Sequence, residues 1–146
     1  LWTLFPYTTL FRSETDEDFN ETLQLAKDLD FDHSYSFIYS KRPGTPASEL
    51  PDNVSLETKK ARLAEFQDVI VKSTWQKTQD MVGKTVRVLV EEHASRIPEH
   101  LLGTADNTRS VMFKGDDDLI GKFVTVKVIR AVSPHLVEGE LAEILG

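Results

Sequence analysis

Cysteine is absent from this sequence of 146 residues. Disulfides, zinc–thiolate sites, cysteine nucleophiles and thiolate-ligated clusters are therefore excluded for this chain, since each requires a cysteine sulfur. Long apolar runs are also missing, because no stretch reaches the roughly 20 residues that a membrane-spanning helix needs. The first residues lack the basic-then-apolar order of a secretory signal. We therefore expect a globular, cytoplasmic protein that does not enter a membrane.

Positive charge is scarce, since 17 lysines and arginines face 24 aspartates and glutamates, for a formal net charge of -7. This balance disfavours indiscriminate nucleic-acid binding, because phosphate affinity comes from clustered lysine and arginine. The excess acid is concentrated in residues 14–32, which hold eight acidic residues against a single lysine. The charge of the whole chain therefore does not decide what the remaining residues bind.

Patterns of metal ligands are equally scarce. The four histidines are scattered and include no pair at the i, i+4 spacing of a helical zinc site. The acidic run Asp116–Asp118 lacks the alternating spacing and the glycine of a calcium loop, so it is typical of a solvated turn. We therefore expect no metal site in this chain.

The first thirteen residues, LWTLFPYTTLFRS, keep neither helical nor strand periodicity for long. Residues 3–13 match what one reading frame of a common sequencing adapter would encode, so we interpret residues 1–13 as a cloning or assembly artefact. The alternative is a genuine strand over residues 4–11, interrupted by Pro6. On either interpretation this segment carries no functional argument.

Residues 14–48 predict a helix followed by a strand. Thr15, with an acidic residue three positions later, has the form of a helix N-cap, and negative charge in the first turn suits the helix dipole. Apolar residues then recur at spacings of four and three, at Phe19, Leu23, Ala26 and Leu29. Residues 33–40 alternate, with three aromatic residues on one side, which predicts a strand.

Residues 49–80 predict a connecting loop and helix. Residues 41–51 contain three prolines and a glycine, which indicates a stiff loop. A long amphipathic helix is expected from the cap Ser55 to about Asp80. We expect its basic face to be solvated, with RNA contact as the alternative; this face comprises Lys59, Lys60, Arg62, Lys72 and Lys77.

Beyond Gly83 the periodicity changes to two, which predicts strands over residues 85–91, 110–114, 121–130 and 135–144. Turns are expected between them at Gly103, Gly115–Asp118, Gly121 and Pro134. Several short strands within about 65 residues suggest a small antiparallel OB-like β-barrel over residues 81–146. The fold class expected for the chain is therefore α+β.

Seven motifs follow one another along the chain after residue 13. They are Glu14-Thr15-Asp16-Glu17-Asp18-Phe19, Ser36-Phe37-Ile38-Tyr39-Ser40, Arg42-Pro43-Gly44-Thr45-Pro46-Ala47, Lys59-Lys60 with Arg62-Leu63, Val82-Gly83-Lys84-Thr85, Leu89-Val90-Glu91 and Ile120-Gly121-Lys122-Phe123-Val124. In this order and spacing they resemble one enzyme family, the tRNA-2-methylthio-N6-dimethylallyladenosine synthases, which are radical-SAM methylthiotransferases with a TRAM domain. The resemblance covers everything after Ser13. It implies a C-terminal fragment: the end of a radical-SAM α/β barrel (residues 14–48), the linker, and an RNA-binding TRAM domain (residues 81–146).

The resemblance implies a parent enzyme that adds a methylthio group to an isopentenylated adenosine next to the tRNA anticodon. Family members use S-adenosylmethionine and two [4Fe-4S] clusters that cysteines hold. This chain has no cysteine, so we expect it to bind no cluster, to be inactive alone, and at most to hold the tRNA anticodon stem-loop as a monomer. The chain also departs from the family's Gly-Arg-Thr-x-x-Asn-Arg pattern, since Thr104 and Thr108 replace the usual arginine and asparagine.

Candidate cofactor-binding residues are Glu14, Thr15 and Arg42. The resemblance places Glu14 and Thr15 at the edge of a barrel strand, although a plain helix cap is the alternative we favour for them. Arg42 lies on the stiff loop and could grip a carboxylate or phosphate, or be ordinary surface charge. No residue of the chain is predicted to be catalytic.

Candidate RNA-binding residues lie on or beside the expected strands, where cations and an aromatic ring would meet phosphates and bases. They are Arg87, Arg109, Phe113, Lys114, Lys122 and Lys127. Arg87 and Lys127 alternate with the valines of their strands, so they should point away from the core. Residues 83–146 contain eight basic and ten acidic residues, so binding would require the charges to segregate onto one face.

Three alternatives to the tRNA enzyme stay open. A sister family methylthiolates a ribosomal-protein aspartate with the same domain order, but its members tend to carry an acidic residue in the loop where this chain has Arg42. Residues 81–146 could instead be a small RNA-binding module that works without an enzyme. The last alternative is a β-domain that only docks proteins.

Overall fold

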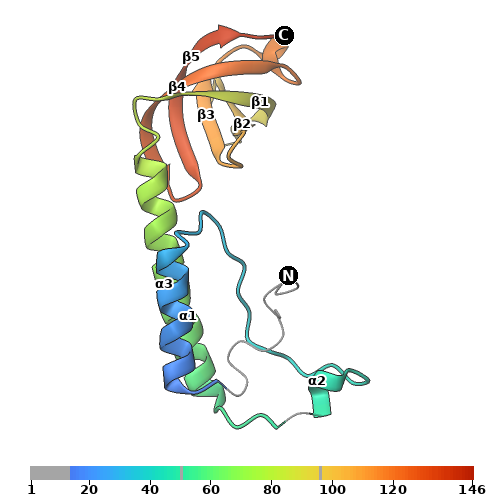
Figure 1. Cartoon of the computed structure of the whole chain (residues 1–146). Helices are drawn as coiled ribbons and strands as arrows, with labels where there is room; N and C mark the ends of the chain where they lie inside the picture. Colours follow the sequence, from blue (N-terminus) through green and yellow to red (C-terminus); the bar gives the residue numbers. More distant parts are fainter. Residues whose placement is uncertain (1–13, 50, 96) are drawn as a thin grey trace. The chain divides into compact units, whose positions relative to one another are not determined.

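The computed structural model describes residues 14–49, 51–95 and 97–146 (Figure 1). The interpretation of residues 1–13 as an artefact therefore lies outside the described part. The chain divides into two compact units, with the boundary between Ser73 and Thr74. Within the described residues, no helix is both long enough and apolar enough to cross a membrane.

The first unit contains α1 (Asp16–Asp28), the short α2 (Pro46–Glu49) and most of α3 (Leu56–Gln79). The expected cap of α1 is confirmed, because the Thr15 hydroxyl accepts a hydrogen bond from the Asp18 amide while the Asp18 carboxylate accepts one from the Thr15 amide. The apolar stripe of α1 packs against α3 in one cluster, except for Leu29, which the sequence placed in the stripe and which is 51% exposed. The buried members of the cluster are Phe19, Leu23, Ala26, Phe66 and Ile70.

Two residues of the basic face of α3 are buried, contrary to the prediction of a solvated face, whereas Lys60 and Lys72 are exposed as predicted. Lys59 is buried and bonds both carboxylate oxygens of Asp52 at 2.5 Å. Arg62 is buried as well, and donates to the Glu14 carbonyl at 2.6 Å and to the Asp16 carboxylate at 2.5 Å. The long apolar parts of both side chains pack against the first unit, while their charged ends bind oxygen atoms. The spacing of basic residues along the helix therefore does not predict how exposed they are.

Residues 33–40 form no strand, contrary to the prediction. Tyr35 and Phe37, expected on one face of that strand, are each 75% exposed. A strand requires a neighbour to accept and donate its ladder hydrogen bonds, and the described residues of this unit offer no other strand. The remnant of an α/β barrel therefore remains an expectation from the family resemblance.

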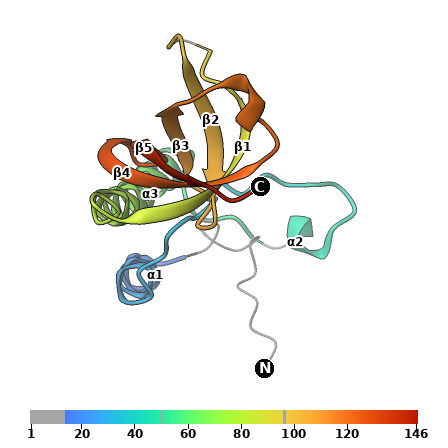
Figure 2. The same cartoon turned by 90° about the horizontal axis from the view of Figure 1, so that it is seen from above.

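The second unit is a closed barrel of five strands, joined in the order β1-β2-β3-β5-β4 (Figures 1 and 2). The strands are β1 (Thr85–His93), β2 (His100–Ala105), β3 (Ser110–Lys114), β4 (Phe123–Ser133) and β5 (Leu136–Ile144). All neighbours are antiparallel except β3 and β5, which run parallel. The small closed barrel that the sequence predicts is confirmed.

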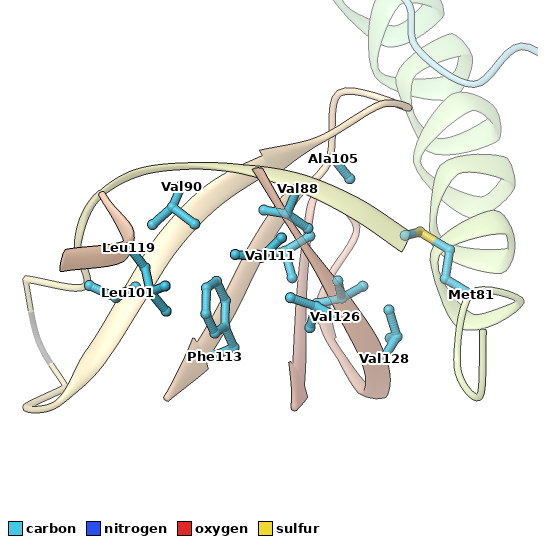
Figure 3. Close-up of a cluster of buried hydrophobic side chains, with 12 residues drawn as sticks. Met81, Val88, Val90, Leu101, Ala105, Val111, Phe113, Leu119, Val126 and Val128 are labelled. Carbon is cyan, nitrogen blue, oxygen red and sulfur yellow. The ribbon is translucent and has the colours of Figure 1, made fainter. Parts of the chain in front are cut away.

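The core of the barrel consists of the residues that the period of two places inward. Val88, Val124, Val126 and Val128 are fully buried, as their alternation with polar residues predicts. Figure 3 shows that side chains from the other strands point into the same interior. The side chain of Leu119, which lies between β3 and β4, points there as well. Because the barrel closes on itself, its strands leave no open edge to solvent.

Strand β2 was missing from the sequence prediction, which placed a turn at Gly103. Gly103 instead lies in the middle of β2, opposite Val90 on one side and Val111 on the other. A Cβ there would fall well within 3.0 Å of the Leu89 carbonyl oxygen. The glycine therefore serves the close approach of β2 to β1 rather than a turn.

Gly103→Ala should lower the free energy of unfolding of the barrel by about 1–3 kcal/mol, since the added methyl group must displace backbone. Chemical denaturation followed by circular dichroism measures this change. Thr104→Ala is the matched control, because it removes only an exposed hydrogen bond to Glu91 from the same strand. Equal stability of the two variants would contradict the close approach.

Arg62→Ala should destabilise the first unit by about 1–3 kcal/mol, because the Glu14 carbonyl loses its partner and Phe19 loses the guanidinium that lies 5.4 Å from its ring centroid. Amide hydrogen exchange in α1 is the measurement, since α1 should open more often. Lys60→Ala, at an exposed position of α3 two residues before Arg62, should leave the exchange unchanged.

Candidate nucleic-acid interface

The outward face of β1 and β4 carries two of the predicted RNA-binding residues, Arg87 and Lys127. Their strands pair in a register that sets Thr85 opposite Lys127, Arg87 opposite Thr125 and Leu89 opposite Phe123. The residues that alternate with these along each strand point into the valine core. The side chains of Arg87 and Lys127 are therefore exposed, as predicted. This exposed face of β1 and β4 is called the β1–β4 face below.

Arg87 is held in place by two neighbours. Its Nε and Nη2 atoms donate to one carboxylate oxygen of Asp106, at 3.3 and 3.1 Å. Its guanidinium carbon lies 5.2 Å from the centroid of the Phe123 ring. Arg87 and Asp106 are both more than half exposed, so their ion pair contributes little to stability but restricts the orientation of the guanidinium.

Lys114 and Lys122 lie near the turn that contains the 3-10 helix η1 (Asp117–Leu119). The Lys114 ammonium is 2.7 Å from the Glu99 carboxylate, and this contact raises the pKa of Lys114 and lowers that of Glu99. Lys122 lies 3.7 Å from the Asp118 carboxylate. A cavity of about 540 Å³ beside Lys114 is lined largely by Glu99 and residues 116–118, so its acidic wall disfavours phosphate.

The RNA contact predicted for Arg109 is wrong, because the side chain is buried, with 2% of the residue exposed. Its Nε donates to the Thr78 hydroxyl at 2.7 Å and its Nη2 to the Thr74 carbonyl at 3.3 Å. The Thr78 hydroxyl is also 2.5 Å from the Pro134 carbonyl oxygen. Arg109 thus fastens the last turns of α3 to the barrel, within the second unit.

The stacking role predicted for Phe113 is also wrong, since its ring is fully buried in the barrel core. The exposed aromatic side chain of the barrel is instead Phe123, which is 40% exposed beside Arg87. Sequence reasoning missed Phe123, although the inward valines at 124, 126 and 128 fix the parity that sends residue 123 outward.

The three candidate cofactor residues are not brought together by any contact in the described residues. Thr15 uses its hydroxyl to cap α1, and Glu14 accepts a hydrogen bond from the Thr22 hydroxyl at 2.9 Å. Arg42 is exposed, and its carbonyl accepts bonds from the Thr45 amide and hydroxyl. Across the described part of the chain, no group of acidic or histidine side chains is placed to hold a metal ion.

Residues 79–142 match the family model of the TRAM domain. The match begins at the end of α3, includes β1 to β4 and covers β5 as far as residue 142. The closed barrel and this match define the second unit as a TRAM domain.

Curated relatives cover nearly the whole chain. A tRNA-2-methylthio-N(6)-dimethylallyladenosine synthase of Psychrobacter sp. (strain PRwf-1) is 70% identical over 139 residues, which is 92% of this chain and 28% of that protein. Proteins of the same name match from Acinetobacter baumannii (strain ACICU), at 56% identity over 90% of the chain and 27% of the relative, and from Shewanella pealeana, at 49% over 86% and 26%. The chain is similar to these relatives over most of its own length and spans about a quarter of theirs.

Arg109→Lys should lower the free energy of unfolding of the second unit by about 1–3 kcal/mol, because an ammonium cannot reproduce the planar fork that reaches Thr78 and Thr74. Denaturant titration measures this loss. Arg87→Lys, which makes the same exchange at an exposed position, should have almost no effect on stability. Similar stabilities of the two variants would contradict the structural role of Arg109.

Proposed function

We propose that the chain is the C-terminal part of a tRNA methylthiotransferase and that its TRAM barrel holds tRNA while the rest of the enzyme modifies it. The observation that carries the proposal is the 70% identity to a protein named as a tRNA-2-methylthio-N(6)-dimethylallyladenosine synthase. The TRAM match over residues 79–142 supports an RNA-contacting role for the barrel. The substrate would be an isopentenylated adenosine beside the anticodon.

The residues of this chain do not fit the two [4Fe-4S] clusters of the parent enzyme, because iron–sulfur clusters need thiolate ligands and the chain has no cysteine. Cluster chemistry is therefore assigned to the parts of the enzyme beyond this chain, and the chain alone should not catalyse the reaction. Contact of Glu14, Thr15 and Arg42 with S-adenosylmethionine stays a proposal. The exposed Arg42 on its proline-rich loop suits a carboxylate, whereas Thr15 already serves α1 as a cap.

The tRNA substrate is favoured over a ribosomal-protein aspartate by two observations. The relatives compared above are all named for action on tRNA. Arg42 also stands in the loop where the protein-modifying family tends to have an acidic residue. A stand-alone RNA-binding module remains the second candidate, because residues 74–146 form a compact unit with their own core.

The full chain should bind an unmodified anticodon stem-loop RNA, with an association constant that falls as salt rises, because Lys127 and Arg87 would displace counterions from phosphates. Fluorescence anisotropy at several salt concentrations is the measurement. Lys127→Ala should weaken binding and reduce the slope of log K against log salt by about 0.7–0.9, the value for one phosphate contact. Lys60→Ala, which removes an exposed lysine from α3, is the matched control.

Binding that does not depend on salt, or no binding at micromolar protein, would contradict the proposed function. An equal loss of slope in Lys60→Ala would show that the barrel is not the site of contact. The enzyme and the stand-alone module are separated by a second experiment. If the barrel serves the enzyme, a full-length relative that lacks the residues corresponding to 74–146 should lose both its affinity for tRNA and its methylthiotransferase activity.

A further inference from the structure

We infer that Arg87 and Phe123 form one stacking platform, on which the β1–β4 face receives an unpaired base of RNA. The inference rests on the proposed function, since it specifies which residues of the TRAM barrel meet the RNA and what form of RNA they take. It differs from the sequence prediction in two ways. The aromatic residue is Phe123 instead of Phe113, and Arg87 joins it in contacting the stacked base.

The platform is preorganised in the structure. Leu89 and Phe123 are direct partners across β1 and β4, and Arg87 lies two residues along β1 on the same face, so its guanidinium reaches over the Phe123 ring. Asp106 holds the guanidinium by its Nε and Nη2 edge. Both members stay accessible, since the Arg87 side chain is 55% and Phe123 is 40% exposed.

The chemistry of this pair suits a nucleobase. A phenyl ring attracts a cation to its face, and the planar guanidinium stacks on aromatic rings. Unpaired RNA bases stack on aromatic side chains and on arginine planes, and this stacking is tolerant of sequence because every base has a π-face. A paired base cannot reach the platform, since its faces are covered by its neighbours in the duplex. The ligand class is therefore single-stranded RNA, such as a loop.

The charges around the platform limit the path of the RNA backbone. Lys127 lies on the same face of β4 and can meet a phosphate. On the β5 side the register sets Glu143 opposite Thr125 and Glu140 opposite Lys127, so carboxylates border the face there. The phosphate chain should therefore run along β1 and β4 and avoid β5.

Asp106 supplies the negative charge nearest to the platform. Its carboxylate orients Arg87 but also repels a phosphate that approaches the same guanidinium. Asp106→Asn keeps the acceptor oxygen and removes the charge. This variant should therefore bind single-stranded RNA severalfold more tightly than the wild-type chain, whereas a purely structural ion pair would give unchanged or weaker binding.

The deciding experiment compares Phe123→Leu with the wild-type full chain. Leucine keeps apolar bulk but has no π-face, so the affinity for oligoadenylate should fall by about 5- to 150-fold, the range for loss of one stacked base. Phe37→Leu is the matched control, because Phe37 is 75% exposed and lies outside the barrel. A fully paired RNA duplex of equal length is the matched probe, and Phe123→Leu should not alter its weaker binding.

Phe123→Trp is the second variant, and it tests the platform even where Phe123→Leu unfolds. Its added indole should keep the affinity for oligoadenylate and lose fluorescence when a base stacks on it, with the emission of Trp2 and Trp75 in the wild-type chain, titrated in parallel, as the background. Unquenched emission at saturating oligoadenylate would overturn the platform. If the wild-type chain binds RNA and Phe123→Leu binds oligoadenylate equally well, the platform fails while the proposed function stands. If the wild-type chain binds neither oligoadenylate nor the duplex, the result contradicts the proposed function itself.

Discussion

Close approach of neighbouring strands at two glycines is the constraint on which the barrel depends. At Gly103 an added Cβ would collide with the carbonyl of Leu89, and at Gly139 it would lie 2.5 Å from the carbonyl oxygen of Lys127. Both positions are therefore restricted to glycine, one in β2 against β1 and the other in β5 against β4. Each glycine therefore marks a place where the backbone of the neighbouring strand leaves no room for a side chain.

Closure also decides which side chains remain available to a partner. Once the inward positions are filled by valines, Leu101, Leu119 and Phe113, the alternation of each strand sends the remaining residues outward. Arg87 and Phe123 meet because β1 and β4 are neighbours in the closed sheet, although 36 positions separate them in the chain. The surface that we assign to RNA is thus a product of the barrel register.

Buried cations in both units serve structure. Arg109 joins the final turns of α3 to the barrel through Thr78 and Thr74, and Arg62 joins α3 to the start of α1. In each case a buried guanidinium donates to oxygen atoms of a neighbouring segment. A basic residue near a strand is therefore weak evidence for RNA contact until its burial is known. Acidic residues outnumber basic ones over residues 83–146, and this balance fits a contact in which stacking adds to a small number of phosphate contacts.

The sequence alone determined the cap and stripe of α1, the span of α3, four of the five strands and the inward valines, because these follow from periodicity and local hydrogen bonds. It also carried the family resemblance. Only the tertiary structure decided that Gly103 lies within a strand, that residues 33–40 pair with no strand among the described residues, that Arg109 and Phe113 are buried, and that Phe123 stands beside Arg87. These outcomes depend on which segments become neighbours in space, and spacing along a single strand carries no information about the strand that will lie next to it.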